Sequence, residues 1–257
     1  MISQLRSRDG TMKHERKQNK NVYIDGVNIP RLLLGTSPFI GAGQFGRRAW
    51  EYRRRFYDNP SNMAGLIAEA AELGITHVQA FGDAVIAKAI EDAREMTGTD
   101  IQVVGSVGAH DFGRELQIMR ALGAKVIMTH GLVTDRLDDN FRECIDRISE
   151  IAVAGAVTHR PGIVIPGLAD FESVKIVMAP INKTGIYMAP SADKALEAIK
   201  ETDKIVIGKK ALSAGSLRPR EALEYVSRYV YGVAIGVASS KELRETFTAA
   251  KEFFKNG

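Results

Sequence analysis

Histidine and lysine residues follow several short apolar runs of this chain. His130 and His159 each end such a run, Lys210 ends another, and Lys183 comes just after a further one. Imidazole titrates near neutral pH and moves protons, whereas a desolvated amine attacks carbonyl groups or anchors anions. We therefore expect His130 and His159 to be acid–base residues. Lys183 or Lys210 is expected to be an electrophile, a Schiff-base amine or an anion anchor.

Plainer structural roles remain open for the same residues. A capped or hydrogen-bonded histidine is common, and a lysine often keeps its head group in solvent. Asp83 or Asp111 is an alternative base. The sequence contains no HEXXH or CxxC pair, so we predict no metal site.

Two loops rich in glycine and serine, both in the C-terminal part of the chain, predict a binding site for an anion. Residues 213–216 read SAGS, and residues 236–240 read GVASS directly before a helical pattern. Glycine allows close approach of the backbone, and free N–H groups at a helix N-terminus attract negative charge. Ser240 as a plain N-cap and Gly215 as a turn residue are the alternatives. The predicted contacts to a phosphate are Ser213, Gly215, Ser216, Gly236, Ser239 and Ser240.

The elements that must position these residues follow from a regular alternation. Short β-rich runs are each followed by a segment of helical period, which is typical of βα units around a parallel sheet. Eight units over residues 21–257 predict a single α/β domain, a (β/α)8 TIM barrel with its ligand site at the C-terminal strand ends. The predicted strands are Arg31–Phe39, Thr76–Phe81, Ile101–Val107, Lys125–His130, Ala154–His159, Val174–Asn182, Lys204–Leu212 and Gly232–Ser239.

Three segments depart from plain alternation. Val22–Ile24 and Val27–Ile29 flank an Asp-Gly turn and predict a β-hairpin that plugs the N-terminal end of the barrel. The first βα loop is long and mixes five arginines with aromatic residues, which favours either a lid over an anionic substrate or an amphipathic surface helix. The fifth helix is expected to be a short turn within Gly167–Ser173.

Composition limits the partners. The chain has 257 residues and a formal net charge of only +4, so we predict no nucleic-acid partner. Residues 1–20 carry much of the basic excess without an apolar run, which predicts a disordered tail and neither a signal peptide nor a membrane span. The single cysteine, Cys144, excludes an internal disulfide and favours a cytoplasmic location. Assembly into a homo-oligomer stays open.

From the hairpin to the last helix, these segments resemble the aldo-keto reductases, with a leaning toward the branch that includes iron–sulfur members. LLLGTSPFIGAG looks like the opening of that family, and AELGITHVQAF resembles the stretch that carries its catalytic aspartate. VIMTHG is similar to the strand that bears the active-site histidine, which implies that role for His130. AGAVTH and VMAPIN resemble the next two strands and align His159 and Asn182 with their terminal residues.

The last two strands extend the resemblance to a cofactor site. IGKKALSAGSL looks like the run that holds a lysine and a glycine, which align with Lys210 and Gly215. AIGVASSKELRET resembles the site for pyrophosphate and adenosine, with Gly236, Ser239 and Glu245 in register. The resemblance therefore implies NAD or NADP as a cofactor.

The catalytic positions of that family are changed in this chain. Its reductases protonate a carbonyl with a tyrosine that is tuned by an aspartate and a lysine beside a histidine. Here the aspartate position is Gln79, the lysine position is Ser106, no tyrosine follows, and only His130 remains. Ala238 stands where a basic residue usually meets the 2′-phosphate of NADP, and Thr246 replaces an asparagine. Neither glutamine nor serine can take the part of a general acid.

Three functions from different classes remain. The first is an enzyme acting on a phosphorylated or nucleotide-like small molecule with a site rebuilt on the reductase scaffold. The second is an NAD(P)-dependent oxidoreductase that uses another acid group. The third is a ligand-binding barrel without catalysis. We favour the first, because polar groups at six or more strand ends are costly to retain without a partner.

Overall fold

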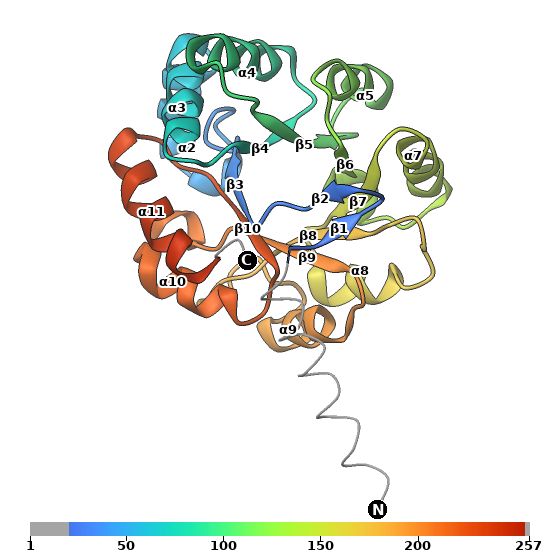
Figure 1. The fold of residues 1–257 in the computed structure, drawn as a ribbon. Coiled ribbons are helices and arrows are strands. Elements are labelled where there is room, and N and C mark those ends of the chain that lie inside the picture. The colour runs from blue at the N-terminus through green and yellow to red at the C-terminus, as the bar shows by residue number, and fades with distance from the viewer. Residues whose placement is uncertain (1–20, 255–257) are drawn as a thin grey trace, which may run out of the picture.

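Eight parallel strands close into a barrel, as Figure 1 shows. The computed structural model describes residues 21–254. The strands of the barrel are β3 (Leu32–Gly35), β4 (His77–Phe81), β5 (Gln102–Val107), β6 (Val126–Thr129), β7 (Val153–Val157), β8 (Ile176–Pro180), β9 (Ile205–Lys209) and β10 (Gly232–Ile235). The barrel closes because its last strand, β10, pairs with its first strand, β3, as well as with the preceding strand, β9. The eight-stranded TIM barrel predicted from the sequence is therefore confirmed.

Helices surround the barrel on its outside (Figure 1). Six of them begin after a residue whose side chain accepts a hydrogen bond from a backbone N–H of the first turn. These residues are Asp83, Asp111, His130, Asp138, Ser191 and Ser239. The helices are α2 (Arg48–Phe56), α3 (Pro60–Glu72), α4 (Ala84–Thr97), α5 (Phe112–Ala121), α6 (Gly131–Thr134), α7 (Asp139–Ser149), α8 (Pro161–Gly167), α9 (Ala192–Glu201), α10 (Pro219–Ser227) and α11 (Ser240–Phe253), with 3-10 turns η1 (Gly43–Phe45) and η2 (Ser213–Gly215).

The fifth helix lies earlier in the chain than expected. Helix α8 ends at Gly167, whereas the sequence interpretation placed a helical turn after that residue. Pro161 starts the helix, because its fixed φ suits the first helical position and its missing N–H costs nothing there. The expected position was therefore wrong, and the short length was correct.

Side chains of the strands alternate between two apolar cores. In β9, Ile205 and Ile207 belong to the cluster inside the barrel, and Val206 belongs to the cluster between barrel and helices. This alternation follows from the two-residue period of a strand. It sets which residues near each strand end face the barrel axis.

A hairpin covers the N-terminal end of the barrel, as predicted (Figure 1). Its strands β1 (Tyr23–Ile24) and β2 (Val27–Asn28) are joined by Asp25 and Gly26 at φ 50° and 77°, the left-handed pair that a tight hairpin turn requires. Val22, Ile24 and Val27 pack against the cluster inside the barrel.

The expected basic tail at residues 1–20 lies outside the described residues. Within residues 21–254, no helix is long and apolar enough to cross a membrane.

Candidate functional site

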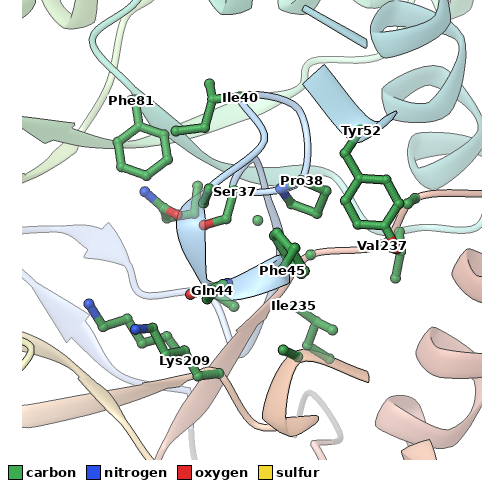
Figure 2. Close-up of a pocket in the computed structure, with 18 of the residues that line it drawn as sticks. Ser37, Pro38, Ile40, Gln44, Phe45, Tyr52, Phe81, Lys209, Ile235 and Val237 are labelled. Carbon is green, nitrogen blue, oxygen red and sulfur yellow. The ribbon is translucent and has the colours of Figure 1, made fainter. Parts of the chain in front are cut away.

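A cavity of about 890 Å³ opens at the C-terminal ends of the strands. It reaches the barrel interior at Val157 and Met178, and it extends outward to Glu245 on α11. Figure 2 shows Lys209, Phe81, Tyr52 and other lining side chains around this space. The ligand-binding end of a TIM barrel is this end, so the cavity is where the fold predicts a site.

Lys209 lines the inner part of the cavity because of its position on β9. Ile205 and Ile207 face the barrel interior, and Lys209 is the next residue of the same parity. Burial lowers the pKa of its ammonium to about 7, with help from the positive charge of Lys210, while Asp135 opposes the shift. A large fraction of this amine is therefore neutral at physiological pH.

Lys210, the lysine singled out in the sequence, has a different setting. Its φ of 57° turns the chain away from the strand, and its Nζ lies 4.1 Å from the centre of the Tyr187 ring. It lines the cavity, and burial lowers its pKa as well. Lys183 instead pairs with Glu221 at 2.6 Å on an exposed surface. The parity of Ile205 and Ile207 was the signal in the sequence that pointed to Lys209.

His130 and His159 meet in the cavity, as expected from their strand ends. Their ring centroids lie 5.6 Å apart in an edge-to-face arrangement, and both rings line the cavity. Each follows an inward-facing residue, Met128 or Val157, by two positions. Gly131 allows this approach, since a Cβ there would collide with the His159 ring.

His130 is held as a neutral imidazole. Burial lowers its pKa to about 4, and the nearby positive charges of His159 and Lys209 act in the same direction. The backbone N–H of Leu132 donates to Nδ1 at 3.3 Å, so the single proton of the neutral ring is on Nε2. His130 can therefore donate a hydrogen bond to a ligand oxygen.

Asp135 orients His159. Its Oδ2 lies 3.6 Å from Nδ1 of His159, and it accepts hydrogen bonds from the His159 backbone at 3.1 Å and from Thr158 Oγ1 at 2.5 Å. Burial works to raise the pKa of Asp135, but these hydrogen bonds outweigh it and hold that pKa below its ordinary value. An ionised carboxylate facing Nδ1 leaves Nε2 of His159 available for proton transfer.

Gln79 and Ser106 stand on neighbouring strands in the cavity wall. Both are buried. Within residues 21–254, Ser106 Oγ has no hydrogen-bond partner. A buried hydroxyl without a partner costs free energy unless a ligand or water meets it. This hydroxyl is therefore available to a water or a polar ligand in the cavity.

Asp83, predicted as an alternative base, caps α4. Its Oδ1 accepts from Val85 N at 2.8 Å and Ile86 N at 3.1 Å, and its Oδ2 accepts from the Tyr57 hydroxyl at 2.9 Å. Burial and the Asp83 carboxylate together raise the pKa of Tyr57. Sequence patterns do not indicate this pair, because Tyr57 directly follows α2 and Asp83 follows β4.

The other alternative base, Asp111, has a structural role at the start of α5. It caps α5 by accepting from Arg114 N at 3.1 Å. The same loop is held by Glu115, whose buried carboxylate accepts from the backbone N–H of Gly108, Ala109, His110 and Asp111. The carboxylate therefore fixes the loop that carries His110, a third histidine of the cavity lining.

The predicted phosphate and cofactor contacts divide into two groups. Gly215, Gly236 and Glu245 line the cavity. A Cβ on Gly236 would lie 2.6 Å from Pro38 Cδ, so this position requires glycine for close packing. Gly215 has φ 86°, in the region that favours glycine.

The remaining predicted contacts are used within the protein. Asn182 is buried, and its amide donates to the Ile186 carbonyl at 2.8 Å. Ser213 Oγ bonds Thr184 Oγ1 at 2.9 Å, and Ser216 Oγ donates to the Ser213 carbonyl at 2.9 Å. Ser239 caps α11, and Ser240 is the exposed first residue of that helix. None of these five is among the residues that line the cavity.

Helix α2 brings two arginines to the cavity. Arg48 donates to the Ala214 carbonyl at 2.6 Å, and Arg53 lies over the Tyr57 ring at 4.3 Å. Arg54 stacks on the exposed Trp50 and is not part of the lining. The long first loop therefore has both features expected from its sequence, cations facing the cavity and a solvent-exposed face.

Carboxylates occupy the outer end of the cavity at α11. Glu242 Oε2 accepts from Ala238 N at 2.8 Å, while Ser239 Oγ accepts from Glu242 N at 3.2 Å. This reciprocal cap places a negative charge of the protein at the helix N-terminus. Glu245 lines the same end. An anion is therefore better accommodated near Arg48 and Arg53 than at the start of α11.

Among residues 21–254, no group of three or more His, Cys, Asp or Glu side chains is arranged to hold a metal ion.

Comparison with known proteins gives a fold and no sequence family. No protein-family model matches the chain, and no curated protein matches it. A Pseudomonas aeruginosa structure assigned to the aldo-keto reductases superposes with a TM-score of 0.63 at 18% identity, over 94% of this chain and 99% of that one. The fold is that of the aldo-keto reductases.

Two further structures set the scope of this likeness. An aldo/keto reductase from Brucella melitensis gives a TM-score of 0.61 at 12% identity, over 92% of this chain and 99% of that one. A phosphoribosyl anthranilate isomerase from Thermus thermophilus gives 0.51 at 16% identity, over 74% of this chain and 94% of that one. Reductases and an isomerase share the barrel, so the reaction must be argued from the site.

Proposed function

We propose that this protein is an enzyme that binds a phosphate-bearing small molecule at the C-terminal end of its barrel and acts on it with His130 and His159. The observation that carries this proposal is a single cavity that joins the two imidazoles to two arginines of α2. An anionic group near the arginines would direct the rest of the ligand toward the histidines.

The charges along the cavity support a phosphate on the α2 side. Arg48 and Arg53 provide donors that suit phosphate oxygens. The backbone N–H groups of Gly215 and Ser216 already donate to carbonyls of their own loop, at 2.8 and 3.3 Å. Side chains rather than backbone groups would then hold the anion.

The chemistry proposed here does not use the tyrosine-based tetrad of the reductases. Gln79 and Ser106 carry no charge, and both are buried in the wall of the cavity. They cannot tune a phenol in the way that an aspartate and a lysine do. The titratable groups that the proposal uses are instead His130, His159 and Lys209, which all line the cavity.

NAD(P)-dependent reduction is a second candidate, and the Tyr57–Asp83 hydrogen bond favours it. It would supply a phenol from α2 in place of the missing tyrosine. The cavity is long enough to reach α11, but Glu242 and Glu245 would repel the 2′-phosphate of NADP. NADH therefore fits this outer end better than NADPH. The cofactor would supply a hydride, and Gly215 and Gly236 would allow its close approach.

Ligand titration tests the proposal. Purified protein is titrated with ribose 5-phosphate, FMN, NADH and NADPH, by fluorescence where the ligand allows it and by thermal shift throughout. The variant Arg48→Gln/Arg53→Gln is compared with Arg54→Gln, which alters the same helix outside the cavity lining. A bound ligand at a hundredfold excess over Kd stabilises by about 2.7 kcal/mol.

We expect at least one phosphate compound to bind, with affinity about tenfold lower in the double variant and unchanged in Arg54→Gln. Equal affinity in all three proteins, or no binding of any phosphate compound, would refute the phosphate site. Oxidation of NADH with a panel of carbonyl compounds would favour the second candidate. Tight binding with no turnover of any ligand would leave a barrel that binds without catalysis.

A further inference from the structure

We infer that Lys209 is a Schiff-base lysine, whose Nζ condenses with the carbonyl carbon of a phosphate-bearing aldehyde or ketone. This inference rests on the proposed function, because it assigns the substrate class and the first chemical step to the same cavity.

The position of Lys209 carries the inference. The side chain continues the inward row of β9 beyond Ile205 and Ile207. Figure 2 shows Lys209 in the wall of the cavity, which His130 and His159 also line from their positions at the strand ends. A rigid strand therefore holds the amine at the inner part of a space that opens toward the arginines of α2. A ligand anchored by phosphate on the α2 side would place its other end toward this amine.

The charge state of Lys209 suits a nucleophile. With a pKa of about 7, roughly half of the amine is neutral at pH 7. An ordinary lysine has about one neutral amine in three thousand at that pH. Burial of the amine is the largest cause of this difference, and the nearby positive charge of Lys210 adds to it.

The neighbouring histidines supply the proton transfers. His130 presents Nε2–H as a donor, because Leu132 N occupies its Nδ1. His159 is turned by Asp135 so that its Nε2 is available as acid or base. The three groups share one cavity, in which the ring centroids of His130 and His159 lie 5.6 Å apart.

The step balances with these groups alone. The Nζ electron pair forms a bond to the carbonyl carbon, and one proton moves from nitrogen to the former carbonyl oxygen to give a carbinolamine. That hydroxyl then leaves as water with a proton from the imidazolium of His159, which leaves a protonated imine. The imine nitrogen can then accept the electron pair of the adjacent carbon–carbon or carbon–hydrogen bond when that bond breaks. No oxidant or reductant is needed.

Borohydride trapping tests the inference. The full chain is incubated with dihydroxyacetone phosphate or with dihydroxyacetone, reduced with sodium borohydride, and analysed by intact mass and by peptide mapping. Lys209→Met removes the amine. Lys183→Met is the matched control, because Lys183 lies on the exposed surface in an ion pair with Glu221. The thermal unfolding of each variant is recorded to establish that it is folded.

We expect one reduced adduct per chain, mapped to Lys209, from dihydroxyacetone phosphate. It should be absent in Lys209→Met, present in Lys183→Met, and at least tenfold weaker with dihydroxyacetone. An adduct on Lys210, or adducts spread over surface lysines, would overturn the assignment.

The two proposals fail in different ways. If dihydroxyacetone phosphate raises the melting temperature and leaves no adduct, the Schiff base is refuted and the phosphate site stands. If dihydroxyacetone labels Lys209 as well as its phosphate does, the lysine assignment stands and the phosphate site is refuted. If neither compound binds or labels, both proposals are overturned.

Discussion

The imidazole rings of His130 and His159 meet edge to face at the C-terminal end of the barrel, with their centroids 5.6 Å apart. The two rings differ in their partners, since a backbone N–H occupies Nδ1 of His130 and a carboxylate faces Nδ1 of His159. Two residues of the same type therefore have different surroundings: His130 is a neutral hydrogen-bond donor, and His159 is an imidazole that a carboxylate orients. Different surroundings for two neighbouring imidazoles are what the proposed acid–base roles require.

The lowered pKa of His130 predicts a loss of stability in acid. The unfolded chain takes up a proton on this imidazole near pH 6.5, whereas the folded protein does so only near pH 4. The contribution of His130 to the free energy of unfolding is thus fully present above pH 6.5. It is lost as the pH falls from 6.5 to about 4, and the loss is at most about 3 kcal/mol. His130→Asn keeps an acceptor for Leu132 N and should remove this component.

Urea unfolding between pH 7.5 and 4.5 checks that prediction. The free energy of unfolding should fall less steeply for His130→Asn than for the wild-type protein. Parallel pH profiles would show that the folded protein does not hold this imidazole neutral.

Lys209→Met should stabilise the protein at pH 7. Folding lowers the pKa of this amine from 10.5 to about 7. Burial of the amine therefore costs no stability above pH 10.5, and its cost grows as the pH falls to about 7. Methionine has a similar length and no charge to bury, and we expect a gain of about 1–2 kcal/mol by chemical unfolding. Lys183→Met, which breaks an exposed ion pair, should stay within about 0.5 kcal/mol of wild type. A destabilised Lys209→Met would contradict the cost assigned to the buried amine.

The barrel and its hairpin could be predicted from the sequence because both follow from local patterns. Continuous apolar runs predict buried parallel strands, and Asp25-Gly26 predicts the hairpin turn. His130 and His159 could be placed at one end of the barrel because each directly follows a strand. A shift of one residue exchanges the two faces of a strand, and for this reason the sequence assigns the functional lysine of this strand to Lys210 rather than to Lys209.

Contacts between distant segments could not be predicted in this way. Tyr57 reaches Asp83 only because α2 and the loop after β4 border the same cavity. Lys210 leaves the strand at a left-handed φ, which no turn signal in a lysine pair indicates. Asn182 has the residue type of a ligand contact but holds its own loop. Such roles depend on the tertiary fold.

Glu115 is expected to be a strong determinant of local order. Its buried carboxylate accepts from four successive backbone N–H groups, two of them Gly108 N at 2.5 Å and His110 N at 2.7 Å. Glu115→Ala leaves these donors without an acceptor, which should cost about 2–4 kcal/mol of stability. Glu115→Gln keeps one acceptor oxygen, so its stability should lie between that of the wild-type protein and that of Glu115→Ala.

Hydrogen exchange gives the local measurement for Glu115. Amides of residues 108–111 should exchange faster in Glu115→Ala, while those of β8 on the far side of the barrel should not change apart from the global loss. Unchanged protection at residues 108–111 would mean that other contacts hold this loop.

The opposite end of the barrel offers a test that separates stability from function. Tyr231 fastens the hairpin, since its hydroxyl donates to the Ile29 carbonyl at 2.9 Å and accepts from Val22 N at 3.1 Å. Tyr231→Phe removes both bonds and leaves the buried Ile29 carbonyl and the part-buried Val22 N–H without this partner, so we expect a loss of about 1–3 kcal/mol in chemical unfolding. Ligand affinity should not change, because the hairpin covers the N-terminal end and the cavity opens at the C-terminal end. A Tyr231→Phe variant with normal stability and weakened binding would contradict this division, and would place part of the binding energy at the end of the barrel that we assign to folding alone.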